Sequence, residues 1–184
     1  MKPISIGTKK TTFEELIAIS RHGAKVQLAE GSKQRIKEAR KLIEQWVKEE
    51  KSIYGVTTGF GALSDVAIST KDTRQLQQNI LMSHSAGTGD MINEETVRAV
   101  MALRIKDFAL GCSGIRLETV EHLITLLNKG VVPMVPEKGS VGASGDLIPL
   151  AHLSLVLIGL GKALCYMVLL QQLYQIMIKI PRTS

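Results

Sequence analysis

Aromatic side chains are scarce in this 184-residue chain, at 4% of all residues. Hydrophobic residues nevertheless make up 45%, so Leu, Ile, Val, Ala and Met must fill the core. An aliphatic core suits packed helices better than an aromatic-rich β-sandwich. At this length the chain can form one ordinary domain. We therefore expect an all-α, mainly helical fold with long functional loops.

Cysteine is also rare, with only Cys112 and Cys165, which lie far apart and match no metal or redox spacing. The four histidines show no i, i+4 pairing, so we predict no metal site. The first residues lack the apolar run of a signal peptide. Free cysteines without a secretion signal indicate a reducing compartment, so we expect a cytoplasmic protein.

The net charge of +6 has no concentrated source, because glutamates interleave with the basic residues. No basic run is flanked by stacking aromatics, which argues against a nucleic-acid partner. Residues 147–160 form an apolar run that is shorter than the roughly 20 residues of a membrane-spanning helix. We predict a buried core helix there and no membrane. Membrane association through residues 147–180 is an alternative, and recovery in the soluble fraction would eliminate it.

Hydrophobic periodicity and capping residues divide the chain into expected helices. A capping box follows Thr11, and Phe13, Leu16 and Ile17 share a face up to Gly23. Further helices are expected from about Ser32 (stripe Ile36, Ala39, Ile43, Trp46, Val47), from about Thr70, from Asn93 to Gly111, from Ile115 to a cap at Gly130, and from Pro149. Two prolines make residues 131–136 extended, with a small strand at 131–135. Residues 54–65 and 83–90 are expected to be loops.

A glycine-rich segment, GSVGASG, occupies residues 139–145. It lacks the Gly-Lys-Ser/Thr ending of a phosphate-binding loop, and its spacing differs from the dinucleotide fingerprint. A plain flexible turn before a helix is one interpretation. A second is chemical, because glycine has the least hindered backbone amide and can take strained geometry. Attack of the Gly145 nitrogen on the Ala143 carbonyl, with loss of water from the ring and from Ser144, makes 4-methylideneimidazole-5-one (MIO).

Three segments together resemble the aromatic amino acid ammonia-lyase family, which includes histidine and phenylalanine ammonia-lyases. The first is EKGSVGASGDLIPLAH at residues 137–152, the second is YGVTTGFG at residues 54–61, and the third is QNILMSHSAG at residues 78–87. Their order and separation also resemble those of the family, over roughly residues 3–164. The resemblance implies the ammonia-lyase/fumarase-like helical fold and an MIO cofactor formed autocatalytically from Ala143-Ser144-Gly145, without metal.

The resemblance also implies a mechanism. The electrophile captures an amino acid, and ammonia is eliminated to give an α,β-unsaturated acid. Tyr54 matches the catalytic tyrosine, the base for the β-proton. A phenol has a pKa of about 10, so the site must favour the phenolate. Gly59, Phe60 and Gly61 would let the loop approach the cofactor, with Gly61 near the substrate. A loop tyrosine packed on the core is the alternative for Tyr54.

Ser83 and His84 match the pair that sets substrate preference in the family. A Ser-His pair implies L-histidine, whose imidazole needs a hydrogen-bonding partner, and the products would be trans-urocanate and ammonia. Asp146 is expected either to orient the cofactor loop or to cap the next helix. His152 is expected to be structural. Phenylalanine or tyrosine ammonia-lyase, an aminomutase, or a non-catalytic fragment are the alternatives.

The family resemblance divides the chain into residues 1–164, an N-terminal MIO-bearing domain, and residues 165–184, an atypical tail without acidic residues. A frameshifted or misassembled reading frame is our hypothesis for the tail, and an uninterrupted frame ending at Ser184 would contradict it. Family members are homotetramers of longer chains whose sites combine subunits. We therefore expect a truncated chain that does not complete an active site alone.

Overall fold

The computed structural model describes residues 2–61, 64, 70–142 and 145–165. Helices predominate in this part of the chain, as the sequence predicts, but short strands accompany them. The elements are β1 (Ile4–Ile6), α1 (Phe13–Ser20), β2 (Val26–Leu28), α2 (Glu30–Lys48), α3 (Thr70–His84), β3 (Thr88–Met91), α4 (Glu94–Phe108), α5 (Leu117–Lys129), β4 (Val131–Pro133), β5 (Pro136–Lys138), α6 (Leu147–Leu157) and β6 (Ala163–Cys165). The tail beyond residue 165 lies outside the described residues.

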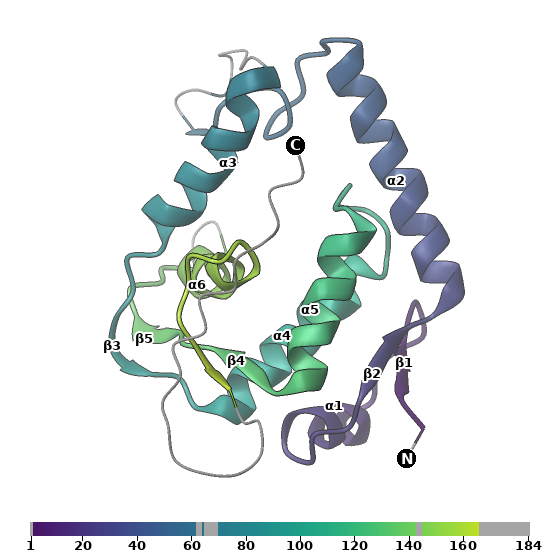
Figure 1. Ribbon diagram of the computed structural model, residues 1–184, viewed down its shortest axis with the longest axis vertical. Helices are drawn as coiled ribbons and strands as arrows, with labels where there is room; N and C mark the ends of the chain where they lie inside the picture. The colour runs from purple at the N-terminus through teal and green to yellow at the C-terminus, as the bar shows by residue number, and fades with distance from the viewer. Residues whose placement is uncertain (1, 62–63, 65–69, 143–144, 166–184) are drawn as a thin grey trace.

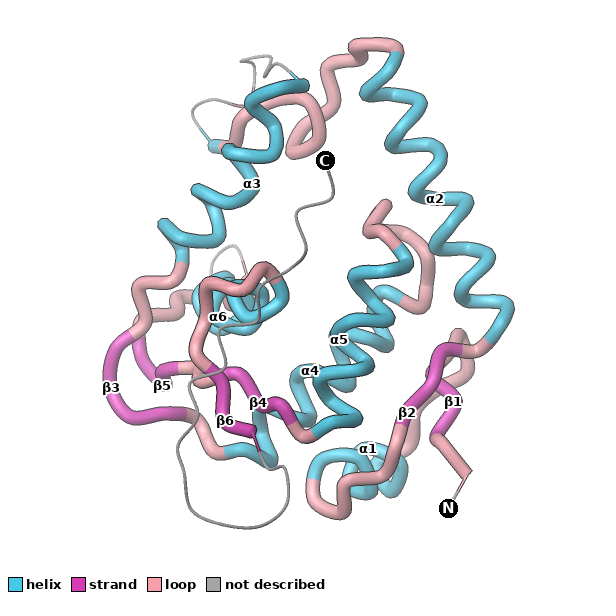
Figure 2. Tube along the Cα trace, in the orientation of Figure 1, coloured by secondary structure: helices cyan, strands magenta, loops and turns pink. Residues whose placement is uncertain are grey.

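The helices α4 and α5 pack against each other near the middle of the molecule, and α2 and α3 extend from it as two arms (Figure 1). Helix α1 packs on α4, and α6 packs on α3. The strands form three two-stranded sheets (Figure 2): β1 with β2 in parallel, and β3 with β5 and β4 with β6 antiparallel. The sequence predicted a strand only around residues 131–135, because three-residue strands leave little periodic signal.

Local capping signals define several helix ends. The capping box at α1 is confirmed: Glu15 N donates to Thr12 Oγ1 at 3.2 Å, and Thr12 N donates to Glu15 Oε2 at 3.0 Å. At α4, Thr96 N donates to Asn93 Oδ1 at 2.8 Å. Gly130 ends α5 with φ +69°, the left-handed conformation that favours glycine. These ends were predictable because each depends on residues within one helical turn.

Three expectations need correction. The face of α1 is predicted only in part: Leu16 packs against the core, but Phe13 is 82% exposed, Ile17 is also exposed, and Ile19 is buried instead. The last helix begins at Leu147; Pro149 is its third residue, a position whose missing N–H needs no helical partner. Residues 83–90 are not all loop, since α3 continues to His84 and β3 begins at Thr88.

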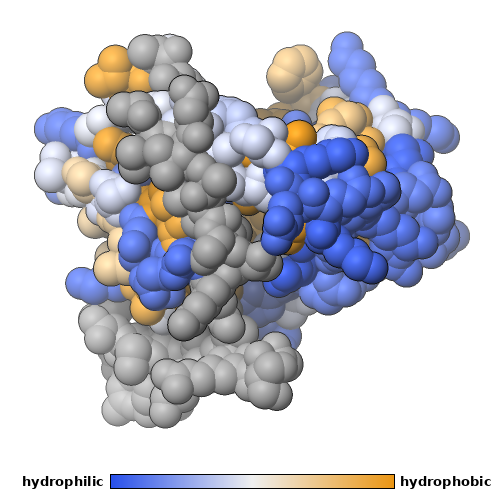
Figure 3. Space-filling view, turned by 90° about the horizontal axis from the view of Figure 1, so that it is seen from above, coloured by the Kyte–Doolittle hydropathy of each residue, from blue (hydrophilic) through white to orange (hydrophobic). Residues whose placement is uncertain are grey.

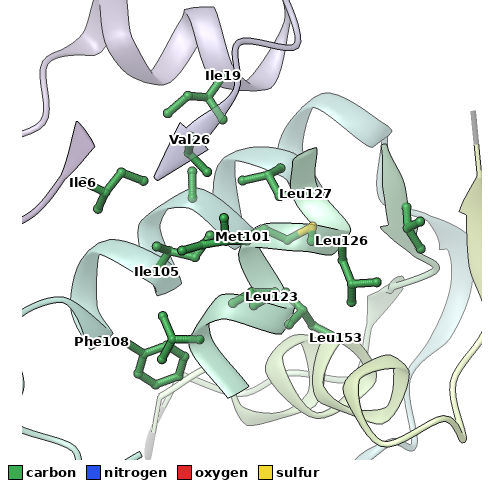
Figure 4. Packing of buried hydrophobic residues seen from close by; sticks show 14 of the residues in the cluster. Ile6, Ile19, Val26, Met101, Ile105, Phe108, Leu123, Leu126, Leu127 and Leu153 are labelled. Atoms are coloured by element: carbon green, nitrogen blue, oxygen red, sulfur yellow. The ribbon is translucent and has the colours of Figure 1, made fainter. Parts of the chain in front are cut away.

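The core gathers aliphatic side chains from most elements around α4 and α5 (Figure 4). Met101 and Ile105 on α4 are 0% exposed, and Leu123 and Leu127 on α5 are 1% exposed. Ile6, Ile19, Val26 and Leu153 reach this cluster from β1, α1, β2 and α6. Helix α2 contributes less: only Ile36 of its predicted stripe is buried, and the side of the molecule that carries α2 is largely hydrophilic (Figure 3).

Arg98 on α4 is buried although it carries a charge, and the sequence analysis did not single it out. Its guanidinium donates to the carbonyl oxygens of Ile19 at 2.9 Å, Ser20 at 3.1 Å and Leu127 at 3.4 Å. These carbonyls belong to the C-terminal turns of α1 and α5, where a cation interacts favourably with the helix dipole. Arg98 thus ties three helices together.

Candidate functional site

Strands β3 and β5 join two of the predicted signature segments. Thr88 pairs with Lys138 and Met91 pairs with Pro136, and Ile92 N donates to Val135 O at 2.8 Å. Strand β3 follows Ser83-His84 in the chain, and β5 precedes the tripeptide Ala143-Ser144-Gly145. The sheet therefore holds the segment that follows Ser83-His84 beside the strand that leads into residues 139–146, the loop expected to form the cofactor and called the cofactor loop below.

Gly87 and Gly139 lie where the two segments come close to each other and to α6. A Cβ on Gly87 would lie 3.1 Å from both Ile148 Cγ2 and His152 Nε2. Gly139 has φ +119°, and a Cβ there would lie 3.2 Å from Ile148 Cδ1 and 3.4 Å from Gly87 Cα. Glycine at both positions lets the two backbones meet over α6.

His152 on α6 forms a hydrogen bond within the same junction. Gly87 N donates to His152 Nε2 at 3.2 Å. An accepting Nε2 requires the neutral ring with its proton on Nδ1. Burial lowers the pKa of His152 and so favours this neutral form. The histidine that the sequence marked as structural thus connects α6 to the segment just after His84.

The cofactor loop is braced by a side-chain bridge. Ser140 Oγ donates to Asp146 Oδ1 at 3.0 Å. Among the described residues, Asp146 makes no capping hydrogen bond to α6, so of its two expected roles the capping one is wrong. Gly145 has φ +86°, and a Cβ there would meet no atom of the described residues within 4 Å. Its glycine is therefore required by conformation and not by crowding. Ala143 and Ser144 lie outside the described residues.

Ser83 and His84 lie at the C-terminal end of α3. Ser83 Oγ donates to Ile80 O at 3.0 Å, and His84 Nδ1 lies 2.9 Å from the same oxygen and 3.1 Å from Ser83 Oγ. A carbonyl oxygen only accepts, so His84 Nδ1 must carry the proton. In the neutral ring Nε2 is then an acceptor. His84 Nε2 can therefore accept a hydrogen bond from an N–H group of a polar ligand.

Tyr54 lies on the loop that follows α2 and is 64% exposed. Its ring meets Phe60 edge to face, with centroids 5.8 Å apart. Gly55 at φ +71° allows this contact, since a Cβ there would lie 3.2 Å from Phe60 Cε1. Thr57 holds the loop: Ile53 N donates to its hydroxyl at 2.9 Å, and the hydroxyl donates to Lys51 O. Gly59 is buried, and Gly61 is exposed with φ +57°.

The predicted site residues fall into two groups in the structure, one at α6 and one on the Tyr54 loop. Ser83, His84, Gly145 and Asp146 all lie on segments that meet at α6. The Tyr54 loop lies at the level of the beginning of α3, whereas His84 is at the end of that helix (Figure 1). At 1.5 Å per residue, α3 spans about 20 Å. The Tyr54 loop and His84 therefore lie near opposite ends of α3.

Sequence reasoning missed Gly87 and Gly139 as the contact between the two segments. Their place inside glycine-containing motifs was a signal, but the partner of each glycine was not visible in the sequence. In the part of the chain that the structure describes, no cluster of three or more His, Cys, Asp or Glu side chains could hold a metal ion. None of the helices in that part is long and apolar enough to cross a membrane.

Comparison with known proteins defines the class to which this fold and loop arrangement belong. The family model for aromatic amino acid lyases matches residues 11–174. The histidine ammonia-lyase of Caldanaerobacter subterraneus is 53% identical over 163 residues, which are 89% of this chain and 32% of that protein. The solved histidine ammonia-lyase of Trypanosoma cruzi superposes with a TM-score of 0.82 at 35% identity, covering 90% of this chain and 31% of that one. Tyrosine aminomutase from Streptomyces globisporus gives a TM-score of 0.84 at 34% identity, with 90% and 31% covered.

The chain is thus a helical lyase-type domain. It belongs to the aromatic amino acid lyase family, as the match over most of its length shows. It spans about a third of the length of the curated relatives that it matches.

Proposed function

We propose that this chain is the cofactor-forming part of a histidine ammonia-lyase, which converts L-histidine to trans-urocanate and ammonia. The observation that carries the proposal is the junction at α6, where the segment after Ser83-His84 meets both flanks of the cofactor loop. A substrate held at His84 would then lie near α6, the helix that follows Gly145 and Asp146 in the chain. The identity to histidine ammonia-lyases, about half of the aligned residues, supports the same substrate.

The residues of the loop fit an MIO group. Gly145 is in a left-handed conformation with open space around it, and the Ser140–Asp146 bridge holds the loop ends together. Ring closure joins the Gly145 nitrogen to the Ala143 carbonyl carbon. One water leaves with that carbonyl oxygen, and a second leaves with the Ser144 hydroxyl and its α-hydrogen. The finished group would supply an electron-poor alkene to which the amino acid can bind.

The remaining roles fall to side chains of this family-matched site. His84 Nε2 accepts the imidazole N–H of histidine, because His84 Nδ1 already donates to Ile80 O. Tyr54 removes the β-proton, and ammonia leaves as the double bond forms. Gly61, at φ +57°, keeps the loop backbone close to the substrate, and Gly59 and Phe60 support the loop.

The separation of Tyr54 from α6 supports a site shared between subunits. A homotetramer, with Tyr54 contributed by a neighbouring copy, would bring the base to the cofactor without any change in the fold of one chain. The cytoplasmic location belongs to the same proposal and rests on cysteine usage.

Intact mass spectrometry of the purified chain tests the cofactor directly. The wild-type chain should weigh two water molecules less than its formula, and Ser144→Ala should lose none through that side chain. For activity, residues 1–164 are joined to the part of the Caldanaerobacter relative that this chain does not cover. The chimera should release ammonia and urocanate from histidine. A folded chimera that turns over histidine without having lost water would contradict the proposal.

An aminomutase is the second candidate, favoured by the similarity to tyrosine aminomutase. The discriminating residues are Ser83 and His84, because His84 Nε2 can accept the imidazole N–H of histidine, whereas the ring of phenylalanine offers no hydrogen-bond donor. Turnover of histidine, phenylalanine and tyrosine by the chimera, with chromatography for β-amino acids, separates the two. Formation of β-tyrosine in place of an unsaturated acid would favour the aminomutase.

A further inference from the structure

His152 is a titratable side chain at the α6 junction that the proposed mechanism does not use. Its Nε2 accepts from Gly87 N at 3.2 Å, across 65 residues of sequence. A second side chain of α6 also contacts this junction. Ile148, one turn earlier on α6, meets the positions of a Cβ on both Gly87 and Gly139.

These contacts place His152 between two functional segments. Gly87 lies three residues after His84, and Gly139 lies four residues before Ala143. A Cβ on Gly139 would lie 3.4 Å from Gly87 Cα and 3.7 Å from Ala86 O, so Ala86 and Gly87 pack against the entry of the cofactor loop. The exit of that loop is the first turn of α6, which carries Ile148, and His152 lies one turn further along the same helix.

The spacing of the loop ends matters for ring closure. The Gly145 nitrogen must approach the Ala143 carbonyl, which requires a compressed backbone between them. Holding reacting atoms at short range accounts for a large part of such a rate, and misplacement by about 1 Å can cost on the order of a hundredfold. A hydrogen bond that fixes the loop entry against α6 therefore acts on the rate of closure.

We propose that His152 is a positioning residue whose neutral imidazole, through the Gly87 N–H, sets the spacing between the Ser83-His84 segment and the cofactor loop. The inference rests on the proposed function for its purpose, but the hydrogen bond itself does not depend on it. The side chain acts through Gly87 and contacts no reacting atom.

The hydrogen bond is tested first, in the complete 184-residue chain labelled with nitrogen-15. A scalar coupling between the Gly87 nitrogen and His152 Nε2, with the Nδ1–H tautomer at residue 152, is the expected NMR result. Loss of the coupling is expected in His152→Phe, which keeps a ring and removes the acceptor. Absence of the coupling in the wild-type chain, or an Nε2–H tautomer, overturns the proposal whatever the cofactor does.

The positioning role is tested by the time course of water loss. The chain is made in a cell-free system and sampled by intact mass. His152→Phe should slow the loss of two waters by on the order of tenfold or more. His152→Gln, whose amide oxygen can replace Nε2 as acceptor, should restore it. His22→Phe, at an exposed histidine far along the chain, is the matched control and should equal wild type.

The outcomes separate this inference from the proposed function. If wild type loses no water, the cofactor proposal fails. The NMR signals of Ser83 and His84 then test the positioning role of His152: they should shift in His152→Phe and return in His152→Gln. If wild type matures and His152→Phe matures equally fast, with these signals unmoved, His152 positions nothing. Equal slowing in the Phe and Gln variants also overturns the proposal, because it would reflect packing and not the acceptor.

Discussion

Ser140 Oγ donates a hydrogen bond to Asp146 Oδ1 at 3.0 Å, so that a side-chain bridge links the two flanks of Ala143-Ser144-Gly145, the tripeptide proposed to form the cofactor. The two residues are six positions apart in the sequence. Asp146 is exposed, so the bridge adds little to global stability. Its effect should appear in the loop chemistry.

Asp146→Ala should therefore slow ring closure by about tenfold while leaving the urea midpoint nearly unchanged. Asp146→Asn keeps an acceptor oxygen and should mature faster than Asp146→Ala. Ser140→Ala should match Asp146→Ala, and the double variant should be no slower than either, because both remove the same bond. Intact mass over time measures each rate. Additive effects of the two single variants would show that the residues act separately.

Tyr54→Phe should leave maturation intact and slow elimination severely. The ring of Phe keeps the edge-to-face contact with Phe60, and the exposed hydroxyl supports no core packing. In the chimera with the remaining two thirds of a relative, kcat should fall by about a hundredfold or more, as expected for loss of a proton-transferring group. Intact mass serves as the control for the cofactor. A Tyr54→Phe chimera with wild-type kcat would remove Tyr54 from the mechanism.

Gly114→Ala should destabilise the chain strongly. Gly114 has φ +66°, and a Cβ there would lie 2.3 Å from Ile43 Cγ1 on α2. Backbone strain and overpacking together predict a loss of about 2–4 kcal/mol in the free energy of unfolding. Gly31→Ala is the matched control, since its Cβ would meet only Arg35 Nη1 at 3.6 Å within α2. Gly31→Ala should raise the free energy of unfolding by about 0.5 kcal/mol. Urea unfolding measures both, and equal midpoints would contradict the packing of α2 on Gly114.

Stability should fall with acidification in two separate pH windows. Burial lowers the pKa of His152 below the ordinary value of 6.5, so the unfolded chain binds a proton before the folded chain does. The contribution of His152 to the free energy of unfolding is complete above pH 6.5. It is lost as the pH falls through the lower pKa that His152 has in the folded chain. Hydrogen bonds from Arg40 and Lys51 lower the pKa values of Glu44 and Glu49 below 4.5, so their contribution disappears at more acid pH.

Urea unfolding between pH 4 and pH 8 measures this dependence, with His152→Gln as the comparison. The variant cannot titrate at residue 152, so it should lose the slope just below pH 6.5 and keep the acid limb. An unchanged slope in His152→Gln would assign that window to another histidine.

Much of the local structure was predictable because its causes are local. The capping box of Thr12 and Glu15, the Asn93 cap and the Gly130 end each involve residues within one helical turn. The buried face of α1 was not predictable in the same way. Periodicity groups Phe13 with Ile17, but only the position of α4 decides that Ile19 is the residue to be covered.

The amino-acid sequence by itself determined the chemistry that this chain can attempt. Only a small residue, a serine and a glycine in the order Ala143-Ser144-Gly145 can close the ring and lose the serine hydroxyl. The tertiary structure decided which other residues that loop meets. Gly87, Gly139 and His152 come together because β3 pairs with β5 and α6 packs on α3, contacts between segments dozens of residues apart. Such contacts depend on how whole elements pack, and so no local spacing in the chain records them.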